Sequence, residues 1–169
     1  RQAEVQEENS AWVAMSEANL PASMELVAQQ YSEISGVADL ARIRAAGGYL
    51  QSVVTGQALG STTIAPEPLT EEDRAAHLDR ADGLYAALIA EDDGSQEDTL
   101  VAVIAFNGRA AIAECRGDLD AATAAYEKAA VRAQEVYPIL AQRSRNRAAT
   151  VSEYTTLPEL IDAATVGAA

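Results

Sequence analysis

The sequence predicts an all-α fold in which antiparallel helix hairpins stack as a short α-solenoid of about seven helices. Of its 169 residues, 37 are Ala, the residue with the highest helix propensity. The β-branched residues are scattered along the chain, whereas a sheet would need them clustered in runs. Helix patterns of similar length are separated by mostly short breaks that contain Gly or Pro, and short breaks make consecutive helices antiparallel neighbours.

The first three predicted helices cover residues 2–19, 21–34 and 37–56. Pro21 suits the first turn of the second helix, where a missing N–H costs nothing. Gly36 is predicted to end that helix, because glycine readily adopts the left-handed conformation that stops helices. Gly47-Gly48 lies inside the third helix and costs roughly 1 kcal/mol per glycine relative to alanine. This cost indicates that a neighbouring backbone packs closely there.

The clearest loop separates the third and fourth helices. Two prolines one residue apart, Pro66 and Pro68, exclude helix in this stretch. Thr70, followed three residues later by Asp73, resembles a capping box that opens a fourth helix over residues 71–91.

The last three helices are predicted over residues 96–116, 119–134 and 138–151. Gly117 ends the fifth helix, and Asp118 is a natural N-cap for the sixth. Pro138 can open the seventh. The chain after Thr150 is predicted to be irregular, with one turn at "PELIDAA".

Three of these helices share one pattern, in which a small residue, a Tyr four positions later and an apolar residue three further lie on one face. The sets are Val27-Tyr31-Ile34, Ala81-Tyr85-Leu88 and Ala122-Tyr126-Ala129. The tyrosines are 54 and 41 residues apart, so the period is not constant. In a chain this rich in Ala, the pattern favours a repeat without defining one.

The stretch "VIAFNGRAAIAECRGDLDAATAAYEKAA" resembles a tetratricopeptide repeat (TPR), a helix pair of about 34 residues. Phe106 stands at the large aromatic of the first helix, and Gly117 stands in the turn between the helices. Arg109 and Ala113 depart from the family pattern. The resemblance, together with the tyrosine pattern, predicts these packing residues: Tyr31, Ala81, Tyr85, Phe106, Ala110, Gly117, Ala122, Tyr126 and Ala129.

The chain is predicted to form one TPR-like domain over residues 1–152, followed by a tail over 153–169. The domain divides into leading helices (1–35), a degenerate repeat with a long loop (36–91), the best repeat (96–134) and a capping helix (138–152). This layout is similar to that of bacterial envelope TPR proteins related to the ancillary Sec-translocon subunit family. The resemblance implies a periplasmic or envelope location and an anchor upstream of Arg1, although a cytoplasmic location stays open.

Composition disfavours several functions. The net charge of −14 repels nucleic acid and anionic lipid, and no apolar stretch approaches the roughly 20 residues that span a bilayer. Cys115 is the single cysteine, and the single histidine, His77, has no nucleophile motif beside it and is interpreted as a surface residue. The segment "EDDGSQED" lacks the register of a calcium loop. We therefore expect no cofactor, no metal and no catalysis.

These features predict a non-catalytic module that binds a protein or peptide segment on a concave face lined by the first helix of each pair. By the TPR resemblance, the groove positions are Ile43, Leu50, Asn107, Ala111 and Glu114. Few basic residues lie there, so an apolar or basic segment suits the groove better than an acidic C-terminus. The alternative is a structural subunit that assembles with copies of itself through apolar residues of the first helix, namely Trp12, Val13 and Met15.

Overall fold

The computed structural model of the chain describes residues 2–60, 67–151 and 153. These residues form seven α-helices and no strand. The helices are α1 (Gln2–Glu17), α2 (Pro21–Gln30), α3 (Ser35–Thr55), α4 (Glu71–Glu91), α5 (Thr99–Arg116), α6 (Leu119–Ala133) and α7 (Pro138–Val151). The turn predicted at residues 158–164 lies outside the described residues.

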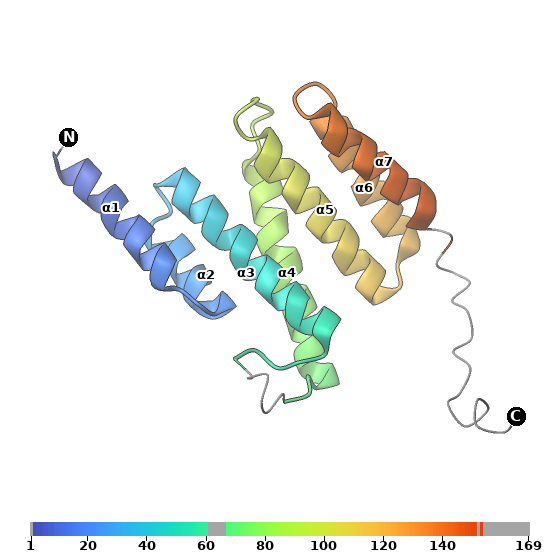
Figure 1. Cartoon of the computed structure of the whole chain (residues 1–169), viewed down its shortest axis with the longest axis horizontal. Helices are drawn as coiled ribbons and strands as arrows, with labels where there is room; N and C mark the ends of the chain where they lie inside the picture. Colours follow the sequence, from blue (N-terminus) through green and yellow to red (C-terminus); the bar gives the residue numbers. More distant parts are fainter. Residues whose placement is uncertain (1, 61–66, 152, 154–169) are drawn as a thin grey trace, which may run out of the picture.

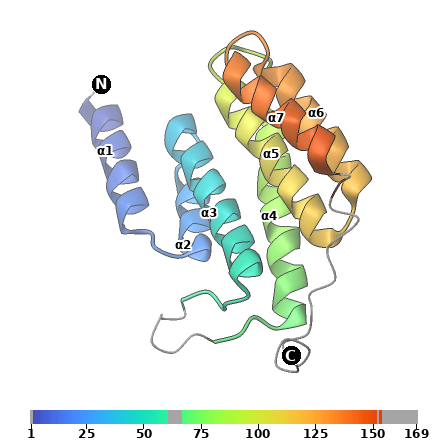
Figure 2. The same cartoon turned by 45° about the vertical axis from the view of Figure 1, so that its right-hand side comes forward.

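The helices form an array of antiparallel hairpins in two layers (Figure 1). The odd-numbered helices lie in one layer and the even-numbered helices in the other, and each helix contacts the next along the chain. Within the odd layer, α3 contacts both α1 and α5. Figure 2 shows the same stack turned, with α1 at one end and the pair α6 and α7 at the other. The fold is therefore all-α, as predicted, and compatible with a helical-hairpin solenoid.

Small side chains dominate the core of the array. Of the 30 buried hydrophobic residues in the described part of the chain, 17 are Ala. Helix axes approach closely where the facing side chains are small, so these helices pack through short contacts. Larger residues fill the centre between α3, α4 and α5, where Tyr49, Leu88 and Ile112 are fully buried. None of the described helices combines the length and apolarity that a bilayer-spanning helix needs.

Side-chain caps and a left-handed glycine define several helix ends, as the sequence predicts. The Thr70 hydroxyl accepts a hydrogen bond from the backbone N–H of Asp73 at 3.1 Å, and Asp118 accepts one from the N–H of Ala121 at 3.0 Å. Gly117 has φ 76°, the left-handed conformation that ends α5. The ends of the loop between α3 and α4 are held together by an isolated antiparallel bridge between Gln57 and Pro68.

The prediction that Gly36 ends the second helix is wrong. Helix α2 ends earlier, at Gln30, and Gly36 lies in the first turn of α3. The reversal between them is made by backbone hydrogen bonds, from the N–H of Ile34 to the carbonyl of Tyr31 and from the N–H of Val37 to the carbonyl of Ile34. Because these bonds close the turn without a left-handed residue, no glycine is needed at the end of α2.

Gly48 is a point of close approach, and its neighbour Gly47 is not. A Cβ atom at Gly48 would lie 2.7 Å from the Cγ atom of Pro21, at the start of α2. A Cβ atom at Gly47 would meet nothing within 4 Å. The expected close packing therefore occurs at one of the two glycines, and it involves a proline ring rather than a backbone.

The predicted packing residues lie mainly at helix contacts. Six of them are buried: Ala81, Tyr85, Ala110, Ala122, Tyr126 and Ala129. Tyr31 is half-buried against the core formed by α1, α2 and α3. Gly117 is exposed in its turn, and Phe106 is half-buried.

Candidate protein-interaction surfaces

The predicted groove positions lie on the odd-layer helices α3 and α5. Ile43 and Leu50 are half-buried beside the central core. On α5, Asn107, Ala111 and Glu114 share one face, because successive members are four and then three residues apart, about one helical turn each. Two of these three side chains are engaged by α7, which leaves less of this face available than the sequence suggests.

The contacts between α5 and α7 are polar and specific. The Asn107 Oδ1 atom accepts a hydrogen bond from the buried Ser144 hydroxyl at 3.0 Å. The Glu114 carboxylate accepts hydrogen bonds from Nε and Nη2 of Arg147 at 3.1 and 2.8 Å. These bonds, together with one to Tyr126, raise the pKa of Arg147 above its ordinary value. Peptide binding by the predicted positions stays a prediction.

A groove lies on the face formed by the even-numbered helices. It is bordered by α4 and α6 and has residues of α5 at its base; we call it the α4–α6 groove. It has a volume of about 280 Å³. Phe106 and Ala113 of α5 form its floor, and Ala121 and Ala125 of α6 form part of one wall. Its remaining lining residues are Asp82, Arg109, Arg116, Asp118, Ala124 and Lys128.

Ion pairs between α4 and α5 border the α4–α6 groove. The Nε atom of Arg109 lies 2.7 Å from Oδ1 of Asp82, and Nη2 of Arg116 lies 2.7 Å from Oδ1 of Asp79. Because both arginines are neutralised by aspartates, the rim is close to neutral in a strongly acidic chain. The groove is therefore suited to a largely apolar segment whose polar groups meet a mixed-charge rim.

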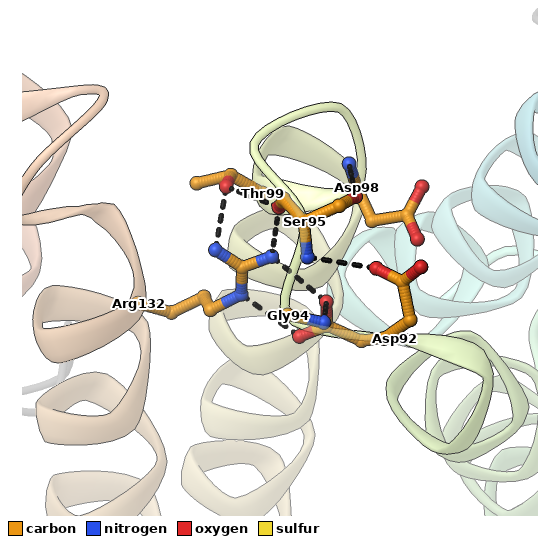
Figure 3. Close-up of polar contacts among 7 residues, drawn as sticks. Asp92, Gly94, Ser95, Asp98, Thr99 and Arg132 are labelled. Carbon is orange, nitrogen blue, oxygen red and sulfur yellow. Dashed lines mark hydrogen bonds and ion pairs between the residues drawn. The ribbon is translucent and has the colours of Figure 1, made fainter.

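The acidic connection between α4 and α5 is held to α6 by Arg132 (Figure 3). Nε and Nη2 of Arg132 donate to the two oxygens of Asp92 at 2.9 and 2.8 Å. Nη2 also donates to the carbonyl of Ser95, and Nη1 donates to the hydroxyl of Thr99, each at 2.5 Å. Four of the five guanidinium N–H groups are thus used to join α6 to the α4–α5 connection.

Three carboxylates of this connection, Asp92, Asp93 and Asp98, have oxygens within 4.8 Å of one another. Both oxygens of Asp92 already accept hydrogen bonds from Arg132. Asp93 accepts one from the N–H of Ser95 at 2.7 Å. A cation bound by all three residues would compete with Arg132 for the oxygens of Asp92, so the arrangement favours a structural clamp made by Arg132 and Asp92.

The clamp between Arg132 and Asp92 makes the free energy of unfolding depend on pH. The Arg132 guanidinium holds the pKa of Asp92 below its ordinary value of 3.8; the N–H of Gly94 contributes in the same direction, and burial opposes both. A carboxyl with a depressed folded-state pKa stabilises the fold above its unfolded-state pKa. That contribution is lost as the pH falls through the folded-state value.

Asp92→Asn is therefore expected to lower the free energy of unfolding by a constant amount above about pH 5, and by progressively less as the pH falls below about 4. Urea denaturation curves recorded from neutral to acidic pH measure this difference. In an Arg132→Met background, the effect of Asp92→Asn should vary much less with pH. An effect of Asp92→Asn that is equally large at neutral and acidic pH would contradict the role assigned to the clamp.

His77 belongs to a polar cluster between α3 and α4, which corrects its interpretation as a surface residue. Its Nδ1 atom lies 2.6 Å from the hydroxyl oxygen of Ser52, and its ring lies against that of Tyr49 at a centroid distance of 5.2 Å. The Ser52 hydroxyl is buried and donates to the carbonyl of Tyr49 at 3.0 Å. The hydrogen bond between Ser52 and His77 therefore joins α3 to α4.

The apolar residues proposed for self-assembly do not all lie at the surface. Trp12 and Val13 of α1 are exposed, whereas Met15 is only 2% exposed. Met15 packs with Ala11 in the core formed by α1, α2 and α3. The prediction that Met15 forms part of an exposed contact is therefore wrong, because this face of α1 covers α2 and α3.

The α4–α6 groove was not found from the sequence. The sequence predicts Phe106 only as a packing residue, and it shows Arg109 only as a departure from the TPR pattern. The available signal is Arg109 itself, because an arginine on an otherwise apolar helix indicates exposure to solvent.

The fold and its surfaces define an array of helix hairpins with hollows between helices. Comparisons with protein-family models, curated proteins and solved structures found no match for this chain. The resemblance to TPR proteins therefore stays a prediction based on the residues given above.

Proposed function

We propose that the chain is a non-catalytic interaction module that binds a segment of another protein or a peptide. The observation that carries this proposal is the α4–α6 groove, with Phe106 and Ala113 on its floor, alanines of α6 on one wall and charged residues at its rim. Small alanines leave room for a partner's side chains, and a half-buried aromatic offers apolar area at little conformational cost.

The groove runs between two helices, and this shape suits a helical or extended segment better than a small molecule. A segment in the groove would place apolar side chains over Phe106 and Ala113, and polar groups beside the Arg109–Asp82 pair. This is the helix-in-groove mode of recognition, in which apolar side chains spaced along one face provide most of the affinity.

Filling the groove tests the proposal. Ala121 is an exposed position on its wall, so Ala121→Trp is expected to weaken partner binding by at least about tenfold without unfolding α6. A partner is first identified by cross-linking from a photoreactive residue at position 121, with mass spectrometry. Its affinity for purified variants is then measured by calorimetry.

Ala149→Trp provides the matched control, since it makes the same substitution at an exposed position of α7 that does not line the groove. It should change the affinity by less than about twofold. If both variants weaken binding equally, or if no protein is cross-linked from position 121, the groove is not the binding site.

Self-assembly remains the alternative function. Exposed Trp12 and Val13 favour it, and a mass by light scattering that rises with protein concentration would support it. A location in the bacterial envelope rests only on the TPR resemblance, and fractionation of cells tests it directly.

A further inference from the structure

A second hollow lies at the other end of the array, between the first half of α1 and the start of α3; we call it the α1–α3 cleft. Its volume of about 460 Å³ exceeds that of the α4–α6 groove. It is lined by Glu4, Glu7, Glu8, Trp12, Glu33, Ile34, Gly36 and Val37. Figures 1 and 2 both show α1 and α3 side by side here, at the N-terminal edge of the array.

Trp12 is the one residue of α1 with an apolar ring that lines the α1–α3 cleft, and Val5 lies on the same face of the helix outside the lining. Trp12 is 44% exposed and Val5 is 57% exposed, and their spacing of seven residues puts them on one face. The core-facing stripe of α1, with Ala11 and Met15, is separate and buried. Trp12 therefore exposes aromatic surface to the cleft, and Val5 adds apolar surface on the same face of α1.

The charges of the cleft decide what it can bind. Three glutamates of α1 and Glu33 line it, and the described lining includes no Lys or Arg. Helix α1 itself carries Glu4, Glu7, Glu8 and Glu17 and no basic residue. A purely apolar occupant would remove the carboxylates of Glu7, Glu8 and Glu33 from water, which is costly. A second copy docking through the same face would place like charges together.

We propose that the α1–α3 cleft binds a cationic amphipathic segment of a partner protein. Apolar side chains of the segment pack on Trp12 and Val5, while its Arg and Lys side chains pair with Glu7, Glu8 and Glu33. An arginine over the indole of Trp12 adds a cation–π contact. The chain's net charge of −14 attracts such a segment from a distance. This cleft shares no described lining residue with the α4–α6 groove. The two proposed binding sites are therefore tested independently.

Trp12 supplies the readout, because it is the only tryptophan of the chain and lies in the cleft. The probe is a helical peptide of Leu, Ala and Arg, free of aromatic residues, with its arginines along one face. Titration into the full chain is expected to shift the Trp12 emission to the blue and to saturate. Affinity should fall as salt is added, and the same peptide with each Arg replaced by Glu should not bind.

Two variants test the cleft without touching buried residues. Glu7→Gln with Glu8→Gln is expected to weaken peptide binding by about five- to tenfold. Gly36→Arg places a cation in the cleft, where a Cβ atom would meet nothing within 4 Å, and is expected to weaken binding by at least about tenfold.

Each variant has a matched control. Glu71→Gln with Glu72→Gln removes the same charge from exposed positions of α4, and Gly83→Arg adds the same side chain at an open glycine of α4. Both controls should bind the peptide within about twofold of the unaltered chain, and circular dichroism should show equal helicity throughout.

Equal losses in variants and controls would mean that the peptide is attracted only by overall charge, and would overturn the proposal. An unchanged Trp12 emission at saturation, or binding of the all-Glu peptide, would also overturn it. So would a blue shift of Trp12 on concentrating the chain alone, since a second copy would then occupy the cleft. None of these results bears on partner binding at Ala121, which the cross-linking experiment decides.

Discussion

Gly108→Ala is expected to lower the free energy of unfolding by about 2 kcal/mol, although alanine is the better helix former. A Cβ atom at Gly108 of α5 would lie 2.3 Å from Cε2 and 2.4 Å from Cζ of Tyr85 in α4. The Tyr85 ring is only 5% exposed and packs in the central core, so it cannot move aside freely. The clash would therefore force α4 and α5 apart.

Urea denaturation followed by circular dichroism measures this loss. The control is Gly83→Ala in α4, where a Cβ atom would meet nothing within 4 Å. It is expected to stabilise the protein by about 0.5–1 kcal/mol through lower backbone entropy in the unfolded chain. If the two variants change stability in the same direction, the close contact between Tyr85 and Gly108 does not control the packing of α4 on α5.

Arg132→Met is expected to be the more destabilising of the two main substitutions, with a loss of about 3 kcal/mol. The variant keeps an apolar stem but removes the cation from Asp92, which is only 12% exposed. It also leaves the carbonyl of Ser95 and the hydroxyl of Thr99 without their guanidinium donor. A poorly solvated carboxylate that loses its partner costs more than the pair itself contributes.

A double-mutant cycle isolates this interaction. Arg132→Met combined with Asp92→Asn should cost clearly less than the sum of the two single changes, since the double variant removes both charges of the pair and leaves neither without its partner. Arg143→Met, on the exposed face of α7, is the control and should change stability by no more than about 0.5 kcal/mol. Strict additivity in the cycle would show that Arg132 and Asp92 do not stabilise the fold as a pair.

Much of the local structure could be predicted, because its causes lie within a few residues. Thr70 and Asp118 cap helices by bonding to N–H groups three residues away, and Gly117 ends α5 through its own φ angle. The error at Gly36 has the same origin in reverse. A glycine permits a left-handed helix end without requiring it. Here α2 ends before Gly36 in the sequence, because backbone hydrogen bonds around Tyr31 close the turn.

The candidate surfaces could be predicted only in part. Helical periodicity groups Asn107, Ala111 and Glu114 on one face, but it does not reveal that Ser144 and Arg147 of α7 engage two of them. Nor does it reveal that Met15 is covered while Trp12 is open. These outcomes depend on partners that are distant in sequence and meet only in the folded array.

By itself the sequence determined the helical class, the order of the helices and most of their ends, since propensity, caps and prolines act over one or two turns. Only the tertiary structure decided which face of each helix is covered. It therefore also decided where the α4–α6 groove and the α1–α3 cleft lie. The physical reason is that the burial of a side chain depends on the helix packed against it. The residues of that helix are distant in sequence, as Tyr85 is from Gly108.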